Sequence, residues 1–142
     1  MMDSKPMSTP MESGLQLFIS DSSPQVYATL YQQIIGGLIY LTYARLDIDF
    51  VVNYLSRFMQ EPKTSHWLAA KRVLRYIHGT MDHGLEYKKN DQFFLTGYTD
   101  ADYAGSVDDR KSTSRFVFFL GSGPISRGSK KQATVAHSST EA

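Results

Sequence analysis

The chain has 142 residues, of which 42% are hydrophobic and 20% charged, and its formal net charge is +1. This globular mixture excludes an intrinsically disordered chain, and a net charge so close to zero gives no bulk electrostatic indication of a nucleic-acid or membrane partner. Because there is no cysteine, a disulfide framework is excluded and a zinc site is not expected.

The first residues are rich in serine, threonine, proline and glycine. This composition predicts an irregular arm over residues 1–23, with low order up to Ser13. The arm lacks the apolar core of a secretory signal peptide, and the longest apolar-rich stretch, residues 34–41, is far too short to span a bilayer. The sequence therefore favours a cytoplasmic or nuclear location without a membrane partner.

A helix is predicted to start at Ser23 and Pro24, a capping hydroxyl followed by a proline that suits the first turn. Within it, Gly36 and Gly37 each cost roughly 1 kcal/mol of helix propensity against alanine. Such a pair predicts the close approach of a neighbouring element. The apolar side chains that follow the helical period are Tyr27, Leu30, Tyr31, Ile34, Ile35, Leu38 and Leu41.

Two further helices are predicted, one over residues 48–60 capped by Asp47, and one from Thr64 or Ser65 to about His78. Three helices with short connections make a small antiparallel bundle over residues 24–79. The apolar side chains expected inside it are Val51, Val52, Leu55, Phe58 and Met59 from the second helix, and Trp67, Ala70, Val73, Leu74 and Ile77 from the third.

After Gly79 the period changes to that of strands. Residues 85–88 and 93–98 read as a hairpin, residues 115–120 as a further strand, and Ile125 as a short one. Residues 138–141 form a capping box that announces a helix, but the chain stops one residue later. The class is therefore α+β, with an incomplete β-sheet in residues 83–142.

Four acids lie close together in the sequence without a base among them: Asp100, Asp102, Asp108 and Asp109. Fixed carboxylates of this kind bind Mg²⁺, and two such ions can drive phosphodiester hydrolysis. The alternative is an acidic surface loop, which residue types alone favour.

Several short sequence motifs, in both the predicted helical region and the predicted β region, carry a family resemblance. They are GYTDADYAG at 97–105, KSTS at 111–114, FVFFLG at 116–121, SKKQ at 129–132 and SSTEA at 138–142, with YQQIIGGLIYLT at 31–42, LSRFM at 55–59 and AAKRVLRY at 69–76. The chain resembles copia-type retrotransposon Pol polyproteins over roughly residues 8–142. Residues 24–79 resemble the segment that joins the reverse transcriptase palm to the ribonuclease H domain, and residues 83–142 resemble the start of that domain.

The resemblance implies a ribonuclease H-like sheet in which four acids hold two Mg²⁺ ions and cleave the RNA strand of an RNA–DNA hybrid. Asp100 and Glu141 match two of those four acids, and the other two are absent. We therefore expect only a remnant of the metal site, no bound cofactor and no nuclease or polymerase activity. Arg115 and Arg127 stand where the family has a glycine and a tryptophan, and burying either would be costly.

Basic residues offer phosphate contacts, which the resemblance places near the hybrid backbone. The candidates are Lys71, Arg72, Arg75, Arg110, Lys111, Lys130 and Lys131. They predict weak, salt-dependent and sequence-independent binding to an RNA–DNA hybrid or other nucleic acid, and the alternative, at about even weight, is a solvated charged face. Phenylalanine-rich strands without covering helices are a hazard for self-association.

A second and weaker resemblance rests on four residues, Arg72, Val73, Leu74 and Arg75. They match the R-x-L-R pattern of effectors secreted by oomycete plant pathogens, although the retrotransposon resemblance already accounts for the string. It implies secretion, entry into the host cell, contact with host plant proteins and suppression or triggering of host cell death. Arg72 and Arg75 are expected to reach solvent from one polar helix face.

Overall fold

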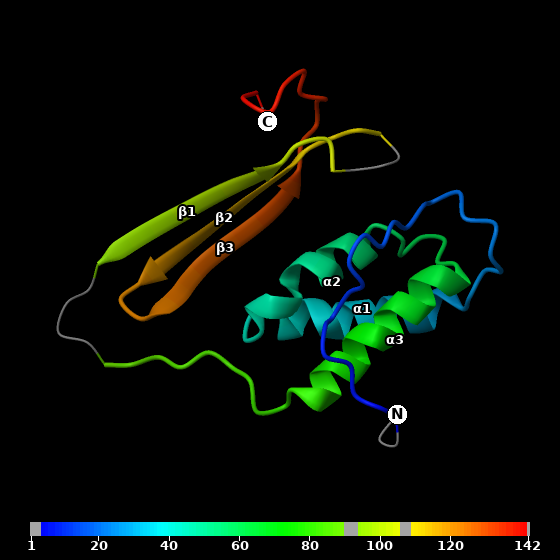
Figure 1. Cartoon of the computed structure of the whole chain (residues 1–142), viewed down its shortest axis with the longest axis horizontal. Coiled ribbons are helices and arrows are strands. Elements are labelled where there is room, and N and C mark those ends of the chain that lie inside the picture. Colours follow the sequence, from blue (N-terminus) through cyan, green and yellow to red (C-terminus); the bar gives the residue numbers. More distant parts are fainter. Residues whose placement is uncertain (1–3, 90–93, 106–108, 142) are drawn as a thin grey trace. The chain divides into compact units, whose positions relative to one another are not determined.

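The computed structural model describes residues 4–89, 94–105 and 109–141, and it divides the chain into two compact units, Met1–Gly84 and Leu85–Ala142 (Figure 1). The first unit contains three α-helices, and the second a three-stranded antiparallel sheet. The predicted α+β class is confirmed. In the described part of the chain, no helix is both long enough and apolar enough to cross a membrane.

The helical unit consists of α1 (Ala28–Leu41), a 3₁₀ turn η1 (Leu46–Ile48), α2 (Asp49–Ser56) and α3 (Thr64–Gly79). All three helices contribute to one apolar core. Its buried members are Leu17, Tyr31, Ile35, Leu38, Ile48, Val51, Val52, Leu55, Phe58, Ala69, Ala70, Val73 and Tyr76.

Helix α1 begins later than the predicted start at Ser23 and Pro24. The chain just before it is extended, because the Val26 N–H donates to the Pro62 carbonyl (3.0 Å) and the Thr64 N–H to the Pro24 carbonyl (2.9 Å). These backbone bonds compete with a helical turn and place the first turn at Ala28.

Two other helix predictions are corrected. A Cβ added at Gly36 or Gly37 would meet nothing within 4 Å, so no neighbouring element approaches the glycine pair. Helix α2 ends at Ser56, well short of residue 60. Asp47 does not cap it, because its carboxylate is bound by Arg45 and Tyr76 instead.

The buried stripe of α3 includes two polar side chains that periodicity did not select, His66 and Tyr76. His66 is fully buried and stacks on Phe58, with ring centroids 3.9 Å apart. Its Nδ1 accepts the Lys63 N–H (3.0 Å), and its Nε2 lies 3.1 Å from the Phe18 carbonyl. A neutral ring with its proton on Nε2 satisfies both contacts.

Residues 4–23 of the N-terminal arm contain no helix or strand, and several of them make defined contacts. Met7, Met11 and Leu15 pack against the core, and Leu17 is buried. The Leu17 N–H also donates to the Tyr54 hydroxyl (2.9 Å). The arm is held because it supplies both apolar side chains and backbone hydrogen-bonding groups, and only the former are visible in a sequence.

The sheet unit has the strand order β1 (Leu95–Asp102), β2 (Thr113–Leu120) and β3 (Gly123–Lys131). The predicted hairpin of residues 85–88 with 93–98 is wrong. β1 pairs with β2 instead, from Leu95 opposite Leu120 to Asp102 opposite Thr113. Residues 85–89 form no strand. The predicted turn over residues 89–92 lies, from residue 90 on, outside the described residues.

Phenylalanines cover the two glycines inside this sheet. Phe118 lies opposite Gly97, and a Cβ there would come within 2.7 Å of its ring. Phe116 lies opposite Gly128 in the same way, with a distance of 2.5 Å. Each ring therefore fills the place of a missing side chain on the neighbouring strand. Both rings nevertheless remain exposed, at 45% for Phe116 and 41% for Phe118.

Candidate functional site

The two matched carboxylates lie in different local settings within the sheet unit. Asp100 is exposed on β1, directly opposite Arg115 on β2. Glu141 lies in a turn after β3, where its Oε2 accepts the His137 N–H at 2.7 Å. No group of three or more histidine, cysteine, aspartate or glutamate side chains that could hold a metal ion occurs among the described residues.

The other acids near Asp100 have local partners. Asp102 faces Arg115 at 3.8 Å, and Asp109 pairs with Lys131 at 2.9 Å. A Cβ at Gly105 would overlap the Asp102 carboxylate, so a larger residue there would push this side chain aside. Asp108 lies outside the described residues.

Arg115 is half-buried and not fully enclosed, which removes most of the cost expected for an arginine at a glycine position.

Four of the predicted phosphate-binding residues gather at one end of the sheet. The register places Lys130 opposite Ser114 and Lys131 opposite Thr113. Arg110 and Lys111 lie three and two residues before the start of β2 at Thr113. The pairing extends one step further, because the Gln132 N–H donates to the Ser112 carbonyl (2.9 Å). We call Arg110, Lys111, Lys130 and Lys131 the sheet-end cluster.

The three predicted cations on helix α3 are already engaged within the helical unit. Arg72 donates from Nε to the Thr9 carbonyl (3.3 Å), from Nη2 to the Thr9 hydroxyl (3.0 Å) and from Nη1 to Glu12 Oε1 (2.7 Å). Arg75 donates from Nε to the Lys5 carbonyl (2.7 Å). The Lys71 ammonium lies 5.2 Å from the centre of the Trp67 ring. Arg72 and Arg75 remain partly exposed to solvent, as expected, but both are already bonded to the arm.

A cavity of about 650 Å³ lies between the arm and α3. Its walls are largely apolar, and basic side chains of α3 contribute to its lining. The residues around it are Ser4, Met7, Glu12, Leu15, Leu17, Ser65, Leu68, Ala69, Lys71, Arg72 and Arg75.

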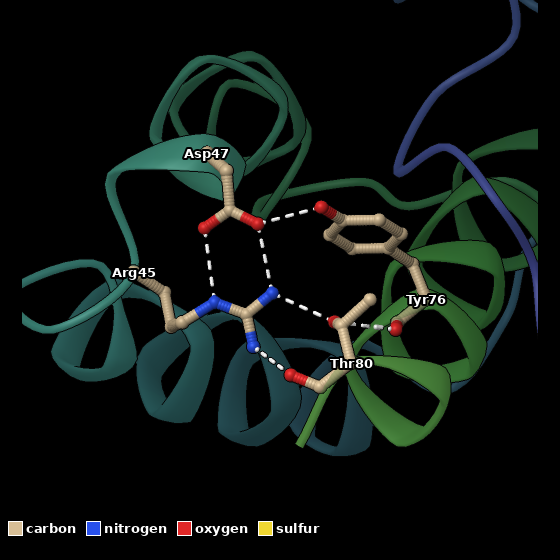
Figure 2. A network of polar contacts seen from close by, with 4 residues as sticks. All are labelled: Arg45, Asp47, Tyr76 and Thr80. Atoms are coloured by element: carbon tan, nitrogen blue, oxygen red, sulfur yellow. Dashed lines mark hydrogen bonds and ion pairs between the residues drawn. The ribbon is translucent and has the colours of Figure 1, made fainter. Parts of the chain in front are cut away.

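Sequence reasoning missed a polar network that joins the connection after α1 to the end of α3 (Figure 2). Arg45 is only 5% exposed and binds both oxygens of Asp47, at 3.0 and 2.7 Å. Its Nη1 and Nη2 also donate to the carbonyl and hydroxyl of Thr80, each at 2.7 Å. The Tyr76 hydroxyl completes the network by donating to Asp47 Oδ2 at 2.7 Å.

The network shifts the titration of its members. The hydrogen bonds from Arg45 lower the pKa of Asp47 to about 2. The bond to that carboxylate raises the pKa of Tyr76. The bonds drawn in Figure 2 join residues 45 and 47 to residues 76 and 80, so the group acts as a clamp between the connection after α1 and the end of α3. The Arg45-x-Asp47 spacing was the only sequence signal, and a capping role for Asp47 explained it equally well.

Comparison with known proteins places these features in a family. The whole chain is 45% identical to the Retrovirus-related Pol polyprotein from transposon RE2 of Arabidopsis thaliana and 44% identical to that from transposon RE1, and it spans 10% of each. The chain belongs to the copia-type retrotransposon Pol family. It is thus a transposon-derived segment that covers about a tenth of these Pol polyproteins.

A shorter relative is of a different kind. Over 112 residues the chain is 46% identical to the Secreted RxLR effector protein 161 of Plasmopara viticola. This alignment covers 78% of the chain and 79% of the effector protein. No family model matches the chain. No solved structure matches it either, so a ribonuclease H-like form of the sheet remains a prediction from the sequence.

Proposed function

We propose that this Pol segment, taken by itself, binds nucleic acid weakly and without sequence preference. The observation that carries the proposal is the register of β2 and β3, which brings the sheet-end cluster together. Four cations near one end of the sheet offer phosphate contacts that no single part of the sequence provides, with the consecutive Lys130 and Lys131 on opposite faces of β3. Asp109 neutralises part of this charge through Lys131, which is why the binding is weak.

The binding test uses fluorescence anisotropy of a short labelled RNA–DNA hybrid and of labelled single strands of different sequence. With two or three phosphate contacts, affinity should fall about 10- to 40-fold between roughly 50 and 200 mM salt. The double variant Lys130→Glu/Lys131→Glu should weaken binding equally for all sequences. Lys88→Glu/Lys89→Glu makes the same charge change elsewhere in the unit and is the control. Binding that is insensitive to salt, or equal loss in both variants, contradicts the proposal.

We also propose that the segment alone cleaves no nucleic acid. Only Asp100 and Glu141 match the family's four metal-binding acids, and Glu141 is occupied by the His137 N–H. Two carboxylates give an incomplete site for the paired Mg²⁺ ions that the family chemistry uses. The purified chain is incubated with labelled hybrid and Mg²⁺, and no cleavage is expected. Cleavage that disappears in Asp100→Asn would refute this.

A second candidate function has one observation in its favour, the 46% identity to a secreted RxLR effector over most of that protein. On this alternative the chain would be secreted, enter plant cells and suppress or trigger host cell death. The bonds from Arg72 and Arg75 to the arm count against a freely presented R-x-L-R string. The chain is expressed in leaf tissue with and without a cell-death inducer, beside Arg72→Ala/Arg75→Ala. Cell death equal to that of the empty control eliminates this candidate.

A further inference from the structure

The arm covers the basic side of helix α3 at the positions expected to contact phosphate. Arg72 uses three nitrogens on Thr9 and Glu12, and Arg75 uses its Nε on Lys5. The Met7 N–H in turn donates to the Arg75 carbonyl at 3.4 Å. We propose that residues 4–12 are a built-in competitor for nucleic acid on α3, so that this second phosphate-binding surface opens only when the arm lifts. The inference rests on the nucleic-acid binding proposed above and adds its regulation.

The chemistry of the arm supports competition because its oxygen acceptors occupy the donors that would otherwise bind the phosphates of a nucleic acid. Two backbone carbonyls, a hydroxyl and one carboxylate meet the two guanidinium groups. Guanidinium groups recognise carboxylate and phosphate oxygens with the same planar set of donors. A donor that binds Glu12 therefore cannot bind a phosphate at the same time.

The contacts of the arm also show that it can be displaced. The Glu12 side chain is 64% exposed, and ion pairs with so exposed a partner contribute little. The cavity of about 650 Å³ beneath the arm interrupts the packing of residues 4–12, in which Met7 and Met11 are only partly buried against the core. The fully buried apolar anchor of the arm, Leu17, lies beyond this segment and is 5% exposed. Residues 4–12 can therefore detach while the core stays closed.

Two substitutions loosen the arm without removing any cation of α3. Glu12→Gln deletes the carboxylate that competes with phosphate. Gly79→Ala adds a Cβ that would lie 2.8 Å from the Pro6 Cβ, so the irregular arm must move away. Each has a matched control in the same unit. Glu61→Gln makes the same charge change at a residue paired with Lys63, and Gly84→Ala adds a Cβ that meets nothing within 4 Å.

The experiment measures the binding of the labelled RNA–DNA hybrid by the full chain at low salt. Glu12→Gln and Gly79→Ala should each tighten binding about two- to fivefold, the range set by releasing an exposed ion pair and its neighbouring bonds. The controls should not change it. Adding Arg72→Ala/Arg75→Ala to either variant should abolish the gain. Unchanged affinity in Glu12→Gln and Gly79→Ala, or an equal gain in the controls, overturns the inference.

A second readout follows from the reciprocity of competition, because nucleic acid must displace the arm as strongly as the arm displaces nucleic acid. Hydrogen exchange at the Met7 amide should accelerate when hybrid is added. If the hybrid binds through the sheet-end cluster while exchange at Met7 is unchanged, the gating inference fails and the proposed function stands. If no variant binds the hybrid at any salt concentration, the proposed function fails and the inference with it.

Discussion

The helical and sheet units are held together in different ways. In the helical unit, side chains from all three helices and the arm meet in one buried cluster. In the described part of the sheet unit, Ala136 is the only buried apolar side chain, and large residues such as Leu95 (65% exposed) and Tyr98 (62%) remain in contact with water. The helices are therefore stabilised by burial of apolar surface, whereas the strands depend mainly on backbone pairing. A sheet of this size requires a covered apolar face for independent stability.

The largest effect expected from this contrast comes from shortening a leucine in each unit. Leu55 is fully buried, so Leu55→Ala should lower the free energy of unfolding of the helical unit by about 2–5 kcal/mol. The same change at Leu120, which is 39% exposed, should lower the free energy of unfolding of the sheet unit by less than about 1 kcal/mol. Trp67, the single tryptophan, lies in α3 and reports unfolding of the helical unit in urea, whereas hydrogen exchange of β2 amides reports the sheet unit. Equal losses for the two variants would remove the contrast.

A smaller effect is expected from the clamp in Figure 2. Asp47→Asn removes the charge that compensates Arg45, which is buried at 5% exposure. The Asp47 side chain is 38% exposed, which reduces the loss to about 1–3 kcal/mol, below that of breaking a fully buried pair. The exposed Asp82→Asn is the control for charge. A clamp variant as stable as this control would mean that the network adds nothing to the fold.

The same clamp gives a pH dependence with a definite sign. The pKa of Asp47 is lowered from 3.8 in the unfolded reference to about 2, so its stabilising contribution is complete above about pH 4. The contribution is lost as the pH falls through about 2. Asp47→Asn should therefore be less sensitive to acid than the wild type in this interval. Bonds from Ser65 and Ser23 also lower the pKa of Asp21 to about 2, so some acid sensitivity should remain.

The smallest expected effects concern glycines, which play opposite parts in the two units. Gly36→Ala and Gly37→Ala should each stabilise α1 by about 0.5–1 kcal/mol, because the new methyl groups meet nothing and helix propensity rises. Gly97→Ala should instead destabilise the sheet, since its Cβ would come within 2.7 Å of the Phe118 ring. Urea unfolding followed by Trp67 fluorescence tests the helix variants, and hydrogen exchange of β2 amides tests the sheet variant. Stabilisation by Gly97→Ala would contradict the account of the ring.

Prediction from the sequence worked where the signal was local. The helical period located all three helices because each buries a stripe of its own residues. It could not show that residues 24–26 pair with residues 62–64, since backbone bonds of this kind carry no side-chain pattern. The hairpin was wrong for a related reason. Alternation marks a strand such as Leu95–Asp102 but does not specify its partner, which is fixed by the whole set of strands.

The candidate site was likewise predictable from the sequence only in part. The sequence named basic residues as candidates for phosphate contact, but only the register of β2 and β3 shows that Lys130 and Lys131 lie opposite the start of β2. Sequence also could not show that Arg72 is engaged. Two of its three partner atoms belong to Thr9, one of them a backbone carbonyl, and nothing in the arm marks these atoms as a binding surface.

The bulge at the end of the sheet makes its two outer edges unequal. Phe118 lies opposite Ser126 and Phe119 opposite Pro124, so Ile125 has no partner and β3 bends at that point. Pro124 has no N–H to offer, and Lys130 and Lys131 charge the same edge, all of which discourages the addition of another strand. β1 has neither a proline nor a bulge. The β3 edge is therefore better protected against pairing with another strand than the β1 edge.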